Sequence, residues 1–247
     1  MSATTRPPLG SRVAVVVGAG VLGLLAACTT STAPPPSSTA SASATATTGV
    51  PAPSAAEILE KARTNAVSAS SAAFTGRIEQ DGTEMVIDFK GTSDGSSADV
   101  TLHLQDQGKV RVISAADEVY LQGDAQFWKS QGLPAPPAAD KFVKAPVAAE
   151  ELTQQLSLNS FLDEAFNAVT PSQLSDTVGS ETVGGVDAWV ITDAKGQAEG
   201  ALYVSKSKFE IVRFTGSSTS PGELDFSRWN EDLGIKAPPA DQVAPLG

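Results

Sequence analysis

The chain has 247 residues, of which 41% are apolar and 18% charged, a composition that fits one globular domain with a less ordered segment attached. Its 17 lysines and arginines against 28 acids give a formal net charge of −11, which excludes the basic surface of a nucleic-acid-binding protein. A single cysteine and a single histidine exclude a disulfide framework and multi-cysteine or multi-histidine metal sites. We therefore expect no metal, no cofactor and no nucleic-acid partner.

The beginning of the chain has the pattern of an export signal. Arg6 and Arg12 precede an apolar run over 13–25, which is too short to remain comfortably as a membrane-spanning helix. The run ends in Leu25-Ala-Ala-Cys28, which resembles the lipobox of bacterial lipoproteins. That resemblance implies a signal peptide over 1–27 and a membrane anchor at Cys28, whose thiolate is the nucleophile that accepts a lipid. The alternative is a plain signal peptide followed by a cysteine by chance.

A segment without charge follows the cysteine. Residues 29–53 are serine, threonine, alanine and proline, apart from Gly49 and Val50. Such a segment cannot bury enough apolar surface to fold. As a flexible coil its 25 residues span about 28 Å. We therefore predict a lipidated tether over 28–53 and one folded domain over 54–247.

The domain is predicted to begin with a helix and to continue mainly in strands. Ser54 and Glu57 form a capping-box pattern before an apolar face with helical spacing, so a helix of about 16 residues is expected from Ser54. Alternating apolar and polar residues, with turn signals such as Asp81-Gly82, predict a meander of hairpins. The expected strands are 74–80, 83–90, 100–105, 109–114, 118–122, 126–130, 141–144, 186–193, 200–205, 209–216 and 223–229. Two short helices are expected near 148–158 and 161–169.

The layout resembles the LppX/LprG lipoproteins of actinobacteria, which share the LolA-like fold. The residues behind this resemblance are the lipobox at Cys28, the helix over 54–70, and the runs 74–78, 118–128 and 225–241. The resemblance implies an α+β fold, a curved and incompletely closed antiparallel sheet (a half-barrel) with helices covering its concave face. It also implies an apolar cavity for the acyl chains of a lipid or glycolipid, and a family without catalytic residues.

These inferences predict a non-enzymatic lipid carrier, anchored to the outer side of the cell membrane and monomeric, whose envelope transporter partner is unknown. The residues expected to line the cavity are apolar positions of the alternating strands: Ile87, Phe89, Val100, Leu102, Leu104, Val110, Val112, Val119, Leu121, Val190 and Leu202. Without the resemblance, an apolar sheet face is more often a core filled by side chains than a cavity. The alternative is therefore a cell-envelope scaffold or interaction lipoprotein with a filled core and no ligand.

Three further features of the sequence are interpreted as structural. His103 alternates with Leu102 and Leu104 and has no acid or nucleophile at catalytic spacing, so we expect it on the polar face of its strand. The stretch 91–95 matches the G-x-S-x-G pattern, but the next element is a strand rather than the helix of a nucleophile elbow, which predicts a hairpin loop. The three tryptophans, Trp128, Trp189 and Trp229, are expected at core edges or at the cavity rim, with sugar stacking as the alternative.

Overall fold

The structure is a computed structural model that describes residues 52–80, 82–132, 141–145, 154–167, 169 and 171–244. The chain divides into two units, Met1–Gly49 and Val50–Gly247, and every described residue belongs to the second. The predicted signal peptide, Cys28 and almost all of the predicted tether therefore lie outside the described residues, and they stay predictions.

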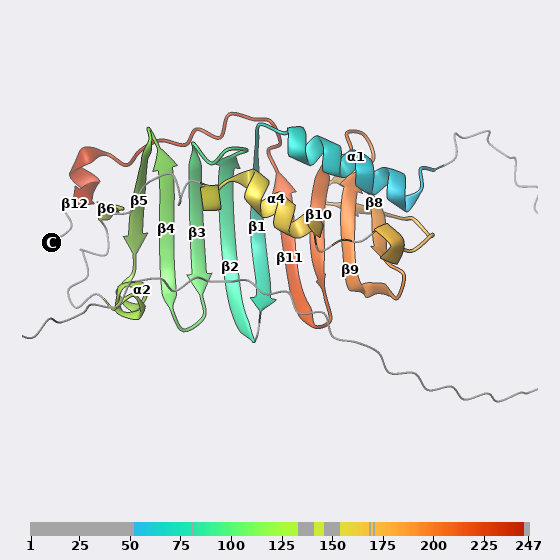
Figure 1. Ribbon diagram of the computed structural model, residues 1–247, viewed down its shortest axis with the longest axis horizontal. Helices are drawn as coiled ribbons and strands as arrows, with labels where there is room; N and C mark the ends of the chain where they lie inside the picture. The colour runs from blue at the N-terminus through green and yellow to red at the C-terminus, as the bar shows by residue number, and fades with distance from the viewer. Residues whose placement is uncertain are drawn as a thin grey trace, which may run out of the picture. The chain divides into compact units, whose positions relative to one another are not determined.

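One open sheet of twelve strands organises the described chain (Figure 1). Its order is β12-β6-β5-β4-β3-β2-β1-β11-β10-β9-β8-β7, and neighbouring strands are antiparallel except for the parallel pair β12 and β6. The strands of the first half are β1 (Ser71–Gln80), β2 (Thr83–Thr92), β3 (Ala98–Leu104), β4 (Gly108–Ala115), β5 (Glu118–Gly123) and β6 (Phe142–Lys144). Those of the second half are β7 (Gly179–Val183), β8 (Val186–Asp193), β9 (Gly196–Ser205), β10 (Ile211–Ser217), β11 (Ser220–Ser227) and β12 (Val243–Ala244). The predicted fold class, a curved and unclosed α+β half-barrel, is confirmed.

Helix α1 (Ala55–Ser68) begins where the capping box predicts. The hydroxyl of Ser54 accepts a hydrogen bond from the backbone N–H of Glu57 at 3.3 Å, and the Glu57 carboxylate accepts one from the Ser54 N–H at 2.8 Å. Both bonds satisfy N–H groups that a helix start leaves unpaired. Three of the five buried residues of α1 are alanines, which lets the helix lie close to the sheet; the five are Ala55, Ile58, Leu59, Ala62 and Ala66.

Helix α4 (Leu158–Asn167) starts three residues earlier than the helix predicted near 161–169. Ser157 supplies the cap, because its hydroxyl accepts the backbone N–H of Ser160 at 3.1 Å. The expected helix near 148–158 lies mostly outside the described residues. In Figure 1, α1 and α4 lie on the same face of the sheet, over its β1 and β8–β11 half.

The predicted strand over 126–130 is wrong, because these residues form the short helix α2 (Ala125–Ser130). Asp124 caps it, with its carboxylate accepting the Phe127 N–H at 2.7 Å. The apolar pair Phe127 and Trp128 then packs back on the sheet end, where the Trp128 indole N–H donates to the Gly123 carbonyl at 2.8 Å. Strand β7, which the sequence analysis did not predict, is polar along most of its length.

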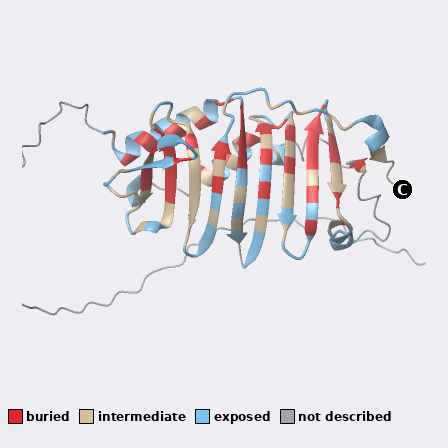
Figure 2. Ribbon diagram, turned by 180° about the vertical axis from the view of Figure 1, so that it is seen from behind, coloured by how far each residue is buried: buried red, intermediate tan, exposed pale blue. Residues whose placement is uncertain are grey.

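The face of the sheet opposite α1 and α4 has no described α-helix across it (Figure 2). We call this the convex face and the helix-covered one the concave face. Towards β6 the convex face carries a small apolar cluster of Ile113, Ala115, Tyr120 and Phe142, against which Ile235, Ala237 and Val243 of the C-terminal segment pack. Near its end this segment forms the single turn η2 (Ala240–Gln242), which leads into β12; the other described single turn, η1 (Pro171–Gln173), precedes β7.

Candidate functional site

Aromatic rings occupy the centre of the concave face. Phe74 of β1 stacks on Phe89 of β2 and on Phe161 of α4, with ring centroids 4.6 and 4.2 Å apart. Phe226 of β11 lies 5.1 Å from Phe74 and in turn stacks on Trp229 at 5.8 Å. Alternation along each strand brings these rings to one face, and α4 adds Phe161 from above. This part of the concave face is therefore filled by side chains. The rings belong to a larger cluster of buried apolar residues, which we call the central cluster and which also includes Ile87, Val100, Ile191, Leu202 and Leu224.

A narrow apolar void lies beside the central cluster, between α4 and strands β9–β11. It measures about 10 Å³, and its lining is entirely apolar: Phe161, Leu162, Ala165, Phe166, Leu202, Ile211, Phe214, Leu224 and Phe226. Pockets that hold drug-sized ligands measure roughly 300–1,000 Å³. The void is thus too small for an acyl chain as the described residues stand, but it marks the seam at which α4 meets the sheet.

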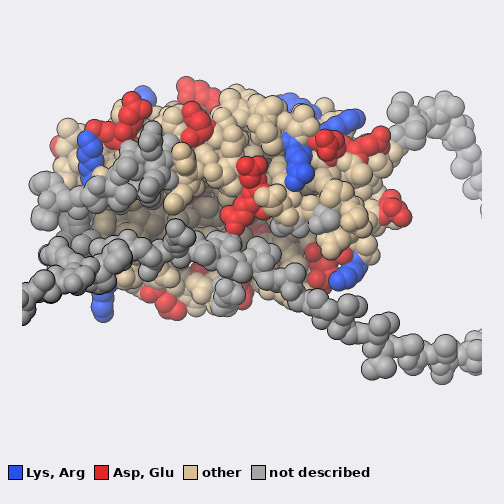
Figure 3. All heavy atoms as spheres, in the orientation of Figure 1, with Lys and Arg blue, Asp and Glu red and all other residues tan. Residues whose placement is uncertain are grey.

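A second apolar cluster lies on the concave side of β3–β5. Val110, Val112 and Val119 are buried there, and the described residues packed against them are Leu102, Leu121, Phe127, Ala145 and Leu156. We call it the valine cluster. Figure 3 shows the described surface set back over this part of the face. Leu102 packs against both clusters and so joins them into one apolar band.

Ten of the eleven predicted lining residues lie on the concave side, and nine of these belong to the two clusters. Four are in the central cluster, namely Ile87, Phe89, Val100 and Leu202, and five are in or against the valine cluster, namely Leu102, Val110, Val112, Val119 and Leu121. Leu104, at the end of β3, is partly exposed and belongs to neither cluster.

Val190 requires a correction. It packs with Val183, Ala188, Ala201 and Tyr203 in a separate cluster, whereas the next residue along β8, Ile191, packs in the central cluster with its cross-strand partner Leu202. Consecutive side chains of a strand point to opposite faces of the sheet. Val190 therefore faces the convex side and cannot line a cavity on the concave side.

The concave face also has members that the sequence analysis did not name as lining residues. Phe161, Phe214, Leu224 and Phe226 all border the void under α4. The alternation of Leu224 and Phe226 with polar neighbours signals one buried face, but their proximity to Phe74 depends on the pairing of β1 with β11. That pairing joins residues about 150 positions apart, so no local pattern could have predicted it.

Polar contacts hold α1 and α4 at the rim of this apolar band. The guanidinium of Arg63 on α1 donates to the Phe166 carbonyl at the end of α4 at 3.0 Å and lies 5.2 Å from the Phe166 ring. Asn65 donates to the Lys208 carbonyl at 2.7 Å, which ties α1 to the turn after β9. These hydrogen bonds to backbone carbonyls fix α1 to the end of α4 and to the turn after β9.

The structure also locates the single histidine, the G-x-S-x-G stretch and the three tryptophans. His103 is exposed on the convex side, and the 91–95 stretch runs from the last two residues of β2 into the loop that leads to β3, which agrees with the predicted hairpin. Trp128 is buried, whereas Trp189 and Trp229 are partly buried against the central cluster; the Trp229 indole donates to the Ile211 carbonyl at 2.9 Å.

Among the described residues no three histidine, cysteine, aspartate or glutamate side chains are grouped as metal ligands. No helix in the described ranges is long and apolar enough to cross a membrane.

Comparison with known proteins gives structural likenesses alone. No family model matches the chain, and no curated protein matches it. The solved structure of the lipoprotein LppX from Mycobacterium tuberculosis matches at 13% identity and a TM-score of 0.45, over 74% of this chain and 98% of that one. LprF from Mycobacterium bovis matches at 10% identity and a TM-score of 0.48, over 74% and 96% of the two chains. An uncharacterized conserved protein from Thermus thermophilus matches at 16% identity and a TM-score of 0.35, over 77% and 98%.

LppX is one of the two proteins after which the LppX/LprG family is named, and this is the family that the sequence resembles. At these identities and scores the likeness concerns the arrangement of the chain and says nothing of a ligand. The function of this chain therefore has to be argued from its own residues.

Proposed function

We propose that this chain is a lipoprotein, anchored by Cys28 on the outer side of the cell membrane, that carries the acyl chains of a lipid or glycolipid on its concave face. The observation that supports this most directly is the continuous apolar band from the central cluster through Leu102 to the valine cluster. The described side chains of this band offer no ionisable group to an acyl chain.

The physical basis of the proposed transfer is desolvation. Each methylene that leaves water contributes about 0.8 kcal/mol, so a lipid leaves a bilayer only for a site that covers a comparable apolar area. The void of about 10 Å³ cannot cover it while α4 stays in place. The proposal therefore requires α4 to move away from β9–β11, which exposes Phe161, Phe166 and Phe214 to the ligand.

Uptake by the purified protein tests this proposal. Chain from which lipid has been extracted is mixed with vesicles that contain a fluorescent fatty-acyl lipid, and protein-bound lipid is measured after the vesicles are sedimented. The proposal expects saturable binding that competes with unlabelled lipid of the same class. Binding no greater than that of a protein without an apolar face would contradict it.

The filled core is the observation that favours the second candidate, a cell-envelope scaffold or interaction lipoprotein. The stacked rings of Phe74, Phe89, Phe161 and Phe226 leave little space in the centre of the concave face. In that case α4 stays packed on the sheet, and lipid uptake is absent while the membrane anchor remains. The same uptake experiment separates the two candidates.

The anchor has its own test, independent of the ligand. Cells that express the chain are labelled with a palmitate analogue, and the variant Cys28→Ser is compared with the natural sequence. The proposal expects label on the natural chain alone and release of the variant from the membrane fraction. Equal membrane retention without label would indicate a plain signal peptide that is not cleaved.

A further inference from the structure

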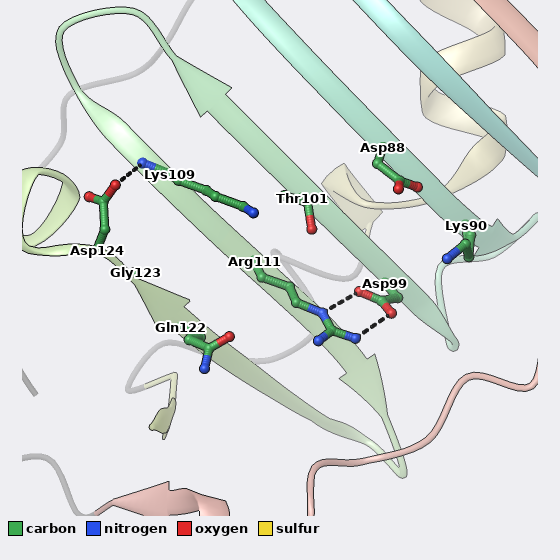
Figure 4. A pocket seen from close by; sticks show the side chains of 9 residues that line it. All are labelled: Asp88, Lys90, Asp99, Thr101, Lys109, Arg111, Gln122, Gly123 and Asp124. Atoms are coloured by element: carbon green, nitrogen blue, oxygen red, sulfur yellow. Dashed lines mark hydrogen bonds and ion pairs between the residues drawn. The ribbon is translucent and has the colours of Figure 1, made fainter. Parts of the chain in front are cut away.

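A polar groove lies on the convex face, away from the proposed lipid site. It has a volume of about 430 Å³ and crosses β2–β5 (Figure 4). Its nine lining residues are Asp88, Lys90, Asp99, Thr101, Lys109, Arg111, Gln122, Gly123 and Asp124. We call it the convex groove. It shares no residue with the central or valine cluster.

Strand register explains why these side chains meet. Asp88, Thr101, Arg111 and Gln122 are direct cross-strand partners and form one row across four neighbouring strands. Neighbouring strands lie about 4.8 Å apart, so the row is a closely spaced line of polar groups. Lys109, two residues before Arg111 on β4, points to the same face and extends over the groove in Figure 4.

Two of the three lining carboxylates are already satisfied within the protein. Asp99 accepts two hydrogen bonds from the Arg111 guanidinium, both at 2.8 Å. Asp124 accepts the backbone N–H of Phe127 at 2.7 Å and that of Lys109 at 2.9 Å. Both carboxylates therefore have little capacity left for a ligand.

Most of the side chains of the convex groove that remain unpaired carry hydrogen-bond donors. The ammonium groups of Lys90 and Lys109, the Thr101 hydroxyl and the Gln122 amide make no hydrogen bond or ion pair with any described residue. Arg111 also keeps N–H groups beyond the two that bind Asp99. Asp88 is the one lining carboxylate that accepts no hydrogen bond from the part of the chain that the structure describes, although its charge acts on Arg111. Three positively charged donor groups, those of Lys90, Lys109 and Arg111, thus accompany one carboxylate without a hydrogen bond to a described residue, that of Asp88.

We propose that the convex groove binds the phosphate group of a small soluble ester. Guanidinium and ammonium donors form short, charge-assisted hydrogen bonds with phosphate oxygens, and Thr101 and Gln122 supply neutral donors beside them. A soluble ester is favoured over a lipid taken up with its acyl chains, because the groove shares no residue with either apolar cluster and would leave such chains in water.

Matched lysine variants test this proposal. Backbone amide shifts of the purified chain are followed during titration with inorganic phosphate, with ionic strength held constant by sodium chloride. We expect saturable shifts at Thr101, Arg111 and Gly123. The variant Lys109→Gln should weaken binding about two- to fivefold, as expected for the loss of one exposed charge pair. Lys195→Gln, in the exposed turn between β8 and β9, should leave it unchanged.

The variant Asp88→Asn gives the opposite expectation, because it removes the free carboxylate that repels an anion. Its affinity for phosphate should rise by a factor of about two to five. Equal affinities for Lys109→Gln and Lys195→Gln, or no saturable shift in the groove, would overturn the proposal.

Vesicles of phosphatidylglycerol serve as the second probe. Vesicle binding that Lys109→Gln abolishes, without binding of inorganic phosphate, would also overturn it in favour of a lipid headgroup.

Discussion

At the scale of single residues, Leu102 occupies a decisive position on the concave face. Its side chain touches both the central and the valine cluster, so a larger side chain there would fill the band along which an acyl chain is proposed to lie. We predict that Leu102→Trp lowers lipid uptake severalfold and leaves the cooperative unfolding transition in place. Uptake is measured with the fluorescent-lipid assay, and unfolding by circular dichroism.

The control for Leu102→Trp lies on the other face of the sheet. Val86 of β2 is exposed on the convex side, so Val86→Trp adds the same bulk away from the proposed site. Its uptake should match that of the natural chain. If both variants take up lipid equally well, the concave face is not the lipid site.

Asp124 shows how a single carboxylate makes stability depend on pH. Burial alone would raise its pKa, but backbone N–H groups of Phe127, Lys109 and Gln126 donate to it and bring the pKa below the ordinary value. A carboxyl group whose pKa is lower in the folded state stabilises the fold above its unfolded pKa of about 3.9. That stabilisation is lost as the pH falls through the folded pKa.

We therefore predict that Asp124→Ala lowers the free energy of unfolding at neutral pH by about 1 kcal/mol, the usual cost of a lost helix cap. The deficit should shrink below about pH 4, where the natural side chain also becomes protonated. Urea unfolding at a series of pH values measures both effects. Asn caps helices about as well as Asp, so Asp124→Asn is the control that removes the charge and keeps the cap. A deficit that stays constant down to about pH 2 would contradict this account.

At the scale of elements, the β1 and β11 pair joins the two halves of the sheet. Gly76 of β1 permits their close approach, because a Cβ atom there would lie 1.9 Å from the Glu223 carbonyl oxygen. We predict that Gly76→Val lowers the free energy of unfolding by about 1–3 kcal/mol or more, since the backbone of β11 has to move. Thr75→Val, at the exposed neighbouring position, is the matched control. Similar unfolding midpoints in urea for the two variants would contradict the prediction.

The elements also show how far the sequence predicts this structure. The cap at Ser54 and the hairpin β1–β2 follow from local signals, because a capping box and an Asp-Gly turn each involve only a few adjacent residues. Local signals misled at 126–130, where five residues are too few to distinguish a strand from one helical turn. Val190 and Ile191 are both buried, so the pattern of β8 does not reveal which of them faces the helices. The pairing of β1 with β11 depends on distant residues and is not encoded locally.

At the scale of the whole molecule, the two faces of the sheet offer different chemistry. The concave face is apolar under α1 and α4, whereas the convex face carries the groove with its lysines, Arg111 and Asp99. Because alternate residues of the same strands supply both faces, a ligand on one side need not displace a ligand on the other. The proposed acyl site and the proposed phosphate site are therefore compatible within one sheet.

The central claim is that the concave face carries lipid, and native mass spectrometry of the exported chain tests it most directly. The variant Cys28→Ser, purified from an actinobacterial host without its anchor, is weighed before and after extraction with organic solvent. The account predicts an added mass that extraction removes and that fragments as a lipid, with much lower occupancy in Leu102→Trp. A clean mass of the bare chain, with no uptake from added lipid vesicles, would contradict it and leave the scaffold as the function.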